Sequence, residues 1–444
     1  MSELTDFAQA AVQAAMAAGA DFADVYCSGT VLTSVDAEKG SINYCASVRD
    51  QGLSVRAFRS GGEGFATVQQ LNLDRARECA QRAVAMAKAA HPDPDFVALP
   101  EPGEAEPVPD LFDDELAGLG ADVAVQWCAR GIEEARAVAD DAIVQGGVSL
   151  SSGEYALASS TGVCVGDRAT SVSMSFFVIV NRDGEVGTYF EQDLARRLSD
   201  FEPEGVGEKA AREALRFLGA EPVGTARMDL ILAPLATMQF IGSVIGAADA
   251  ESVQRNRSFL IGREGEQIAS EALTVQEEPL WPAGLRSSPW DAEGVAKAPR
   301  ALIDRGVLTT YLHNSYTANK AGVENTAHAT RGGYGGGVGV AATNLRIQPG
   351  EKTEAELVSE VDQGLYLSYA GLAPNSITGE VSTTVDFGFK IENGELAHPL
   401  STTMIGSDAF ELLGGIDAVS SDYREEPGVI YPSLRIRSVQ VASE

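Results

Sequence analysis

The strongest constraint on the fold is an order of helical and strand-like segments that occurs twice in the first half of the chain. The helical segments of the first copy lie near 4–18 and 73–90, and those of the second lie near 115–139 and 206–218. Each pair encloses short runs of β-branched and aromatic residues that are separated by turn residues. Such short connections favour antiparallel strands with helices on one side. We therefore predict an N-terminal α/β part with antiparallel sheet flanked by helices, whereas the sequence leaves open whether both copies share one sheet.

The segment between the two copies differs in composition from both of them. Residues 91–110 contain six of the 18 prolines and show no helical period. We interpret this segment as an extended connector. For this α+β chain we predict an N-terminal α+β domain over 1–90, followed by a Pro-rich connector over 91–112. A central α+β region follows over 113–222, and a strand-rich, barrel-like C-terminal domain with a few helices over 223–444.

Local motifs in the C-terminal part predict individual elements. A helix is expected over 234–245, after a strand. Thr353 and Glu356 have the spacing of a capping box, which predicts a helix over 353–363. Asn393-Gly394 lies between two strand-like runs and predicts a hairpin with a type I′ turn. Ser407 is the predicted cap of a short helix that ends at Gly414-Gly415.

The charge balance excludes one large class of partners. The chain has 33 Lys and Arg residues against 64 Asp and Glu residues, a net charge of −31. Binding the phosphates of a nucleic acid requires a surplus of basic side chains, and no basic cluster occurs in the sequence. We therefore expect no nucleic-acid partner. No apolar run is long enough to span a bilayer, so we expect no membrane partner either.

The cysteine pattern indicates a reducing compartment. The five cysteines are widely spaced, odd in number and contain no C-x-x-C motif, which argues against both a disulfide framework and a zinc ribbon. The chain also starts with a helical pattern in place of a signal peptide. We expect a cytoplasmic protein in which these residues are free thiols: Cys27, Cys45, Cys79, Cys128 and Cys164.

The residues that usually carry catalysis are sparse. No two of the four histidines are three to five residues apart, so one helix cannot present two imidazoles to a metal ion. A zinc site formed in three dimensions by His313, His328 and a carboxylate is the weaker alternative. No G-x-S-x-G motif occurs, which removes the usual hydrolase nucleophile.

A glycine cluster over 332–339 allows two interpretations. It lacks a following Lys-Ser or Lys-Thr pair, so it is not a nucleotide loop. It is either a flexible turn between strands or a mobile loop that lets a ligand, such as an extended peptide, approach the backbone closely.

A series of motifs in the C-terminal half adds a resemblance. These motifs are Thr343–Ile347 before Pro349-Gly350, Asn375-x-x-Thr378-Gly379-Glu380-x-Ser382, Ile391–Glu395 and Tyr431–Ile436, and N-terminal matches lie at 18–26 and 52–56. In this order, over essentially the whole chain, the motifs resemble the TldD/PmbA (TldE) family, long known as modulators of DNA gyrase.

The resemblance implies two kinds of subunit. The TldD kind resembles a metalloprotease: a helix carries H-E-x-x-x-H, the two His residues bind zinc, the Glu is the general base, and a Cys near the C-terminus completes the site. The PmbA/TldE kind lacks these residues and pairs with a TldD partner. Together the two subunits trim peptides and mature peptide antibiotics.

In this chain the zinc motif has no counterpart. Aligning the family helix with Leu235–Val244 places Met238 and Ser243 at the His positions and Gln239 at the Glu position. Thioether and hydroxyl groups are poor zinc ligands, and a glutamine cannot accept a proton from water. Residues 401–444 contain no cysteine. The resemblance therefore implies a subunit without catalytic residues, metal or cofactor of its own, with zinc on the partner.

The functional expectation is a non-catalytic subunit of a TldD/TldE-type metalloprotease complex that processes peptides or degrades unfolded ones. A TldD-like zinc-bearing subunit is the expected partner, and a homodimer is possible. The alternatives are a stand-alone homodimeric peptide-binding protein without catalysis and a hydrolase with an unrecognised site. If the family's cleft is shared, the candidates for peptide binding are Asn314, Gly333, Gly335, Thr343, Asn344, Asn375, Thr378 and Gly379, although Asn375 and Thr378 fit a turn equally well.

Overall fold

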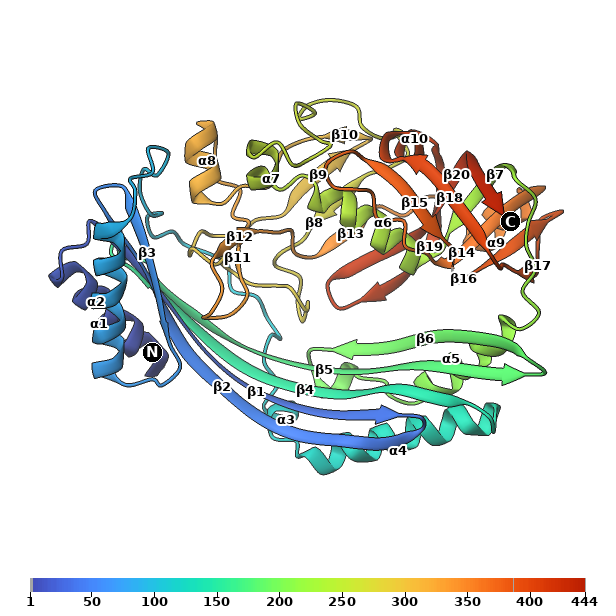
Figure 1. Cartoon of the computed structure of the whole chain (residues 1–444), viewed down its shortest axis with the longest axis horizontal. Coiled ribbons are helices and arrows are strands. Elements are labelled where there is room, and N and C mark those ends of the chain that lie inside the picture. The colour runs from blue at the N-terminus through green and yellow to red at the C-terminus, as the bar shows by residue number, and fades with distance from the viewer. Residues whose placement is uncertain (1–2, 386, 444) are drawn as a thin grey trace.

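The chain folds into two halves that face each other, as the computed structural model in Figure 1 shows. The structure describes residues 3–385 and 387–443. A long, curved sheet from the first half of the chain lies opposite a strand-rich body from the second half. Helices and strands are both plentiful, which confirms the predicted α+β class.

The N-terminal sheet contains six antiparallel strands in the order β3-β2-β1-β4-β5-β6. Its two copies share one sheet, because β1 of the first copy pairs with β4 of the second from Asp24↔Ser159 to Ala37↔Gly146. The strands are β1 (Phe22–Glu38), β2 (Ser41–Arg59), β3 (Gly62–Val68), β4 (Ile143–Ser159), β5 (Cys164–Arg182) and β6 (Glu185–Ala195).

Helices cover one face of this sheet. α4 lies beneath it in Figure 1, on the side away from the C-terminal half. Along β5 the buried residues Val172, Met174 and Phe176 belong to the core that packs with α4 and α5, and they alternate with serines on the opposite face. These helices are α1 (Glu3–Ala17), α2 (Leu73–Ala89), α3 (Asp114–Ala117), α4 (Ala121–Val138) and α5 (Val206–Arg216), with a 3₁₀ turn at Leu198–Asp200. Residues 90–113 form neither helix nor strand.

The C-terminal half is organised around β20 (Val429–Ser443). This strand pairs with β7 (Ala226–Leu232), β13 (Leu345–Ile347), β18 (Thr403–Asp408) and β19 (Ile416–Glu426). The main path runs β10-β9-β8-β13-β20-β7-β14-β16-β17, so the described strands form an open sheet and do not close a barrel. The remaining strands are β8 (Val275–Glu277), β9 (Arg300–Asp304), β10 (Val307–Leu308), β14 (Gln363–Tyr369), β15 (Glu380–Thr384), β16 (Phe387–Glu392) and β17 (Glu395–Pro399).

A separate two-stranded hairpin carries the glycine cluster. β11 (Ala329–Arg331) pairs with β12 (Val338–Val340), and the turn between them reaches the N-terminal sheet. There the Tyr334 hydroxyl donates a hydrogen bond of 2.8 Å to Asp50. A Cβ atom at Gly52 would lie 2.5 Å from the Tyr334 ring, so a larger residue at that position would displace the ring.

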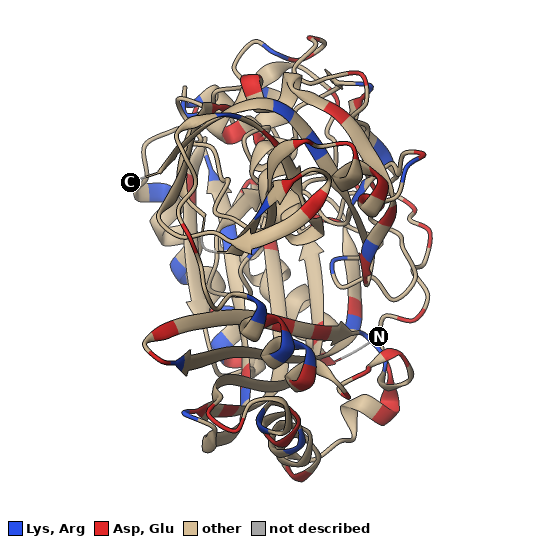
Figure 2. Cartoon of the chain, turned by 90° about the vertical axis from the view of Figure 1, so that its right-hand side faces the viewer, with Lys and Arg blue, Asp and Glu red and all other residues tan. Residues whose placement is uncertain are grey.

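Short helices complete the C-terminal half. They are α6 (Pro234–Gly246), α7 (Ala250–Gln254), α8 (Ser315–Ala321), α9 (Glu354–Ser359) and α10 (Ala409–Gly414). Among the residues that the structure describes, no helix is long and apolar enough to cross a membrane. Figure 2 shows acidic and basic positions interspersed over both halves, with no basic face in that view.

The local motifs are confirmed with two corrections. Thr353 forms the predicted capping box, and Asn393 and Gly394 have the positive φ angles of 51° and 80° that the hairpin turn requires. The helix predicted over 353–363 ends at Ser359, because the chain must turn before β14 enters the sheet. The cap predicted at Ser407 is wrong.

The helix that Ser407 was expected to cap is α10. Asp408 caps it instead, accepting a 2.8 Å hydrogen bond from the Phe410 N–H, since its carboxylate is one residue closer to the first turn. The Ser407 hydroxyl donates a hydrogen bond to Glu411.

A buried cluster of charges joins the two halves. Asp24 and Arg56 lie on β1 and β2 of the N-terminal sheet, with an Nε to Oδ2 distance of 2.8 Å. Arg56 also donates to Glu293 at 2.7 Å, and Arg331 donates to Asp24 at 2.9 Å. We call these four residues the interlayer ion cluster. All four side chains are at most 10% exposed, so each charge depends on its partners for stabilisation.

Candidate functional site

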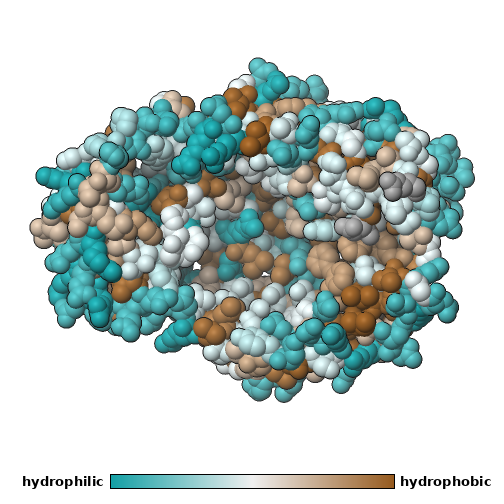
Figure 3. All heavy atoms as spheres, viewed as in Figure 1, coloured by the Kyte–Doolittle hydropathy of each residue, from teal (hydrophilic) through white to brown (hydrophobic). Residues whose placement is uncertain are grey.

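A cleft of about 600 Å³ opens between the two halves, where Figure 3 shows the surface hollowed. One wall is α6, and the opposite wall is the segment Val340–Leu345 that leads from β12 into β13. Leu194 of β6 and the turn from Glu426 to Val429 close its sides. The cleft therefore draws on the N-terminal sheet and on the C-terminal half.

The wall formed by α6 is built from a single face of the helix. Pro234 at the first helical position starts α6 directly after β7, and Phe240, Ile241 and Val244 anchor the other face in the core. The residues facing the cleft share one arc of the helix and are Met238, Gln239, Gly242, Ser243 and Gly246. A Cβ atom at either glycine would meet no described heavy atom within 4 Å, so the helix borders open space.

The polar groups of this face offer no acid–base chemistry. The Ser243 hydroxyl donates a 2.8 Å hydrogen bond to the Gln239 carbonyl oxygen within the helix. The side-chain oxygen Oε1 of Gln239 is buried and has no hydrogen-bond partner among the described residues. Gln239 therefore presents an unsatisfied acceptor, whereas a carboxylate at this position would present a base.

On the opposite wall, a buried carboxylate holds Thr343 in place. Glu277 Oε1 accepts hydrogen bonds from the backbone N–H and the hydroxyl of Thr343 at 2.5 and 2.7 Å. Its other oxygen lies 2.7 Å from His328 Nε2. Burial by itself raises the pKa of Glu277, but the hydrogen bonds from His328 and Thr343 outweigh burial and hold that pKa below its usual value.

Asn344 lies beside Thr343 and is fully buried. Its amide nitrogen donates to the Glu278 carbonyl oxygen at 2.9 Å and to the Ser287 hydroxyl at 2.7 Å. Its side-chain oxygen accepts the Arg286 N–H at 3.2 Å. Because its polar groups are already bonded, Asn344 shapes the cleft wall and offers no free group to a ligand.

The other predicted binding residues lie outside this cleft. Asn314 is the buried cap of α8 and accepts the Thr317 N–H at 2.9 Å. Asn375 organises a turn by accepting the N–H groups of Ile377 and Thr378, and Gly379 continues that turn with a φ of 81°. The structure therefore joins Thr343 and Asn344 with Met238, Gln239 and Ser243, and it does not bring the remaining candidates to them.

The two predicted glycines of the loop border a different pocket. Gly333 and Gly335 flank Tyr334 at the hairpin tip, in a pocket of about 670 Å³ against β1, β2 and β3. Among the described residues, no group of three His, Cys, Asp or Glu side chains could hold a metal ion.

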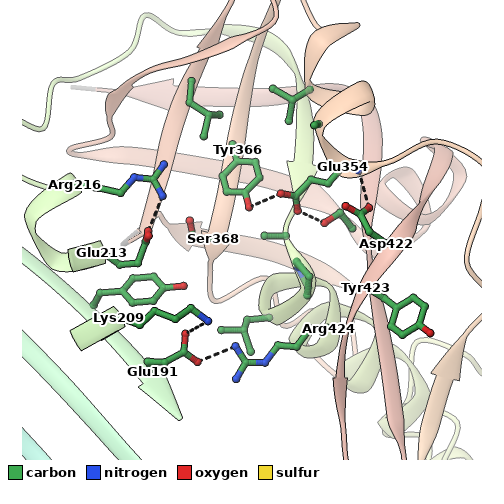
Figure 4. Close-up of a pocket in the computed structure, with 18 of the residues that line it drawn as sticks. Glu191, Lys209, Glu213, Arg216, Glu354, Tyr366, Ser368, Asp422, Tyr423 and Arg424 are labelled. Carbon is green, nitrogen blue, oxygen red and sulfur yellow. Dashed lines mark hydrogen bonds and ion pairs between the residues drawn. The ribbon is translucent and has the colours of Figure 1, made fainter. Parts of the chain in front are cut away.

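A larger pocket, of about 740 Å³, is lined by charged groups that already pair with one another (Figure 4). Glu191 of β6 contacts Lys209 at 2.5 Å and Arg424 at 3.0 Å. Glu354 accepts hydrogen bonds from the hydroxyls of Tyr366 and Ser433. These pairs connect β6 and α5 to the C-terminal half, and they leave few unpaired charges for a ligand.

Comparison with known proteins identifies the family to which the chain belongs. Three models match the chain: PmbA/TldA metallopeptidase domain 1 over residues 23–87, the central domain over 108–218 and the C-terminal domain over 225–443. The chain belongs to the PmbA/TldD family. Its members include Metalloprotease PmbA of Escherichia coli O157:H7, which is 29% identical over 96% of this chain and 93% of that protein. A metalloprotease of Methanothermobacter thermautotrophicus is 28% identical over 91% of this chain and 89% of its own length.

Solved structures of similar proteins share the fold of this PmbA/TldD chain. TldE from Thermococcus kodakarensis has a TM-score of 0.90 at 24% identity and covers 97% of this chain, with 99% of TldE matched. A protein from Bacteroides thetaiotaomicron described as a modulator of DNA gyrase has a TM-score of 0.90 at 24% identity, with both chains fully covered. The two-layer architecture is thus common to these proteins.

Sequence reasoning missed part of the site of this PmbA/TldD chain. Leu194 and Arg286 line the cleft but belong to no motif. Leu194 comes from β6 of the N-terminal sheet, whereas most of the lining comes from the C-terminal half. Arg286 can be recognised as a cleft residue only in the folded chain, because no sequence motif contains it.

Proposed function

We propose that this chain is the metal-free, non-catalytic PmbA/TldE-like subunit of a TldD/TldE-type metalloprotease complex in the cytoplasm. The main support is the face of α6 in the cleft. Met238, Gln239 and Ser243, which we place at the positions of the zinc motif, all border this cleft, yet they carry a thioether, a carboxamide and a hydroxyl. Such a set neither holds zinc well nor takes a proton from water.

The proposed role is to hold part of a peptide while the zinc subunit cuts. Among the described strands, β12 pairs with β11 alone, so no strand occupies its other edge, and we propose that an extended peptide adds there as a further strand. The segment Val338–Ala342 carries only small side chains, which suits recognition of peptide backbone. The five free cysteines support a reducing compartment.

A reconstitution experiment tests this proposal. The purified chain alone should contain less than about a tenth of an equivalent of zinc and should not cleave an unfolded peptide. Mixed with a TldD-type zinc subunit, it should co-elute in size-exclusion chromatography, and cleavage should exceed that of the zinc subunit alone.

Other outcomes separate the alternatives. Cleavage by the chain alone would indicate a hydrolase with its own site. Peptide binding by a homodimer that forms no complex with the zinc subunit would indicate a stand-alone binding protein. Either result would overturn the proposed role.

A further inference from the structure

Arg286 carries a charge that no described residue compensates. It lines the cleft and is exposed, and its guanidinium makes neither an ion pair nor a hydrogen bond within the described chain. Burial raises the pKa of Tyr431, another lining residue, to about 12, and the nearby positive charge of Arg286 acts in the opposite direction. The charge of Arg286 thus acts inside the cleft.

The acidic residues of the cleft are engaged elsewhere. The Asp249 carboxylate caps α7 and accepts hydrogen bonds from the Glu251 N–H and the Ser252 hydroxyl. Glu426 Oε1 lies 3.0 Å from Arg424 Nε, with which it forms an ion pair. Neither carboxylate pairs with Arg286. Although the chain has a net charge of −31, this arginine has no anionic partner among the residues that the structure describes.

Apolar side chains add a second feature of the cleft. Leu285, Leu312 and Val340 belong to the same lining as Arg286. The ligand that suits the cleft therefore brings an anionic group for Arg286 and apolar groups for these side chains.

A peptide carrying a carboxylate meets both requirements, because it offers an anion and apolar side chains. Arginine binds carboxylates through two parallel hydrogen bonds, which makes it more selective than a lysine. We propose that Arg286 receives a carboxylate of the bound peptide, so that this subunit selects peptides with an anionic group next to apolar residues. This inference rests on the proposed peptide-binding function.

The test uses the full chain and four versions of one apolar peptide labelled with a fluorophore. The first has a free C-terminal carboxylate and the second an amidated C-terminus. The third and fourth are amidated and carry Glu or Gln at one internal position. Fluorescence anisotropy gives the dissociation constant of each. The variants are Arg286→Gln and a control, Arg257→Gln, which removes an exposed arginine that lines no part of the cleft and forms no ion pair among the described residues.

The natural chain and Arg257→Gln should bind a carboxylate-bearing peptide about tenfold more tightly than its neutral counterpart. This ratio corresponds to a difference of about 1.4 kcal/mol in the free energy of binding. Arg286→Gln should bind both with the weaker constant. A preference for the free C-terminus identifies a terminal carboxylate, and a preference for Glu over Gln identifies a side chain.

Two results would overturn the inference, and they differ in what else they affect. Tight binding of all four peptides without preference, or a preference that survives in Arg286→Gln, removes the role of Arg286 and leaves peptide binding intact. Absence of binding by every peptide removes the proposed peptide-binding function as well.

Discussion

Single side chains decide what the cleft can do. Gln239 and a glutamate have nearly the same size, but only the carboxylate can take a proton at neutral pH. The identity of residue 239 is readable from the sequence, and its placement at the glutamate of the zinc motif is a prediction from that sequence. That its Oε1 lacks a partner among the described residues is not readable there, because it depends on what surrounds α6 in three dimensions. The same holds for Arg286, whose isolation becomes visible only when every neighbouring acid has been placed.

Asp291 gives a prediction at this scale. Its buried carboxyl group accepts three backbone N–H groups, from Glu293, Val295 and Ala329. Burial, followed by the charge of Glu293, raises the pKa of Asp291 to about 6, whereas an aspartate in an unfolded chain titrates near ~3.9. The folded state therefore binds this proton more tightly. The contribution to stability is complete below about pH 4 and is lost as the pH rises through about 6.

The variant Asp291→Asn removes this titration. Chemical denaturation at pH 4 and pH 7 should show that the variant gains about 2 kcal/mol relative to the natural chain at the higher pH. Asp74→Asn, at an exposed position, serves as the control. A constant difference between Asp291→Asn and the natural chain at both pH values would contradict the assignment.

At the scale of elements, local signals located the helices well and the strands less well. Helix ends depend on caps and on the spacing of apolar residues, which neighbours in sequence provide. The capping box at Thr353 and the turn at Asn393-Gly394 are examples. In contrast, β2 is one strand of 19 residues, although the sequence predicts only short strand-like runs in this part of the chain. Pairing with β1 keeps the backbone extended along its whole length, and this partner strand cannot be inferred from the local sequence.

The placement of α6 beside the cleft can be tested by restoring the zinc motif. The triple variant Met238→His/Gln239→Glu/Ser243→His puts two imidazoles and a carboxylate on the face that borders the cleft. We expect it to bind zinc at least about tenfold more tightly than the natural chain, as measured by competition with a chelating dye. Gln239→Glu alone is the control and should bind no additional zinc. If the triple variant binds zinc no better than this control, the alignment of the helix is wrong.

At the scale of the molecule, the sequence indicated a repeated pattern but not the arrangement of its copies. The shared sheet requires β1 to pair with β4, more than a hundred residues away, and the cleft requires β6 to approach α6 and β13. Such contacts between distant segments leave no periodic trace in the sequence. The interlayer ion cluster is an equally non-local feature, since its four residues come from four separate segments.

The interlayer ion cluster should contribute strongly to stability. Asp24→Asn removes one charge and leaves Arg56 and Arg331 buried with less compensation, so the free energy of unfolding should fall by about 3 kcal/mol. Asp21→Asn is a matched control, because Asp21 pairs with Arg59 at the surface, where such a pair contributes about 1 kcal/mol or less. Equal losses in the two variants, measured by denaturant unfolding, would show that the cluster adds nothing beyond an exposed ion pair.

The spacing of this cluster along the chain has a consequence for biosynthesis. Arg56 precedes Glu293 by 237 residues, and Asp24 precedes Arg331 by 307. A nascent chain emerges from the ribosome N-terminal end first, so the curved sheet can assemble long before those partners have been translated. During that interval Asp24 and Arg56 pair with each other and lack both Arg331 and Glu293. We expect the newly made sheet to expose only two of the four residues of the interlayer ion cluster to solvent until translation passes residue 331 and the second half docks onto it.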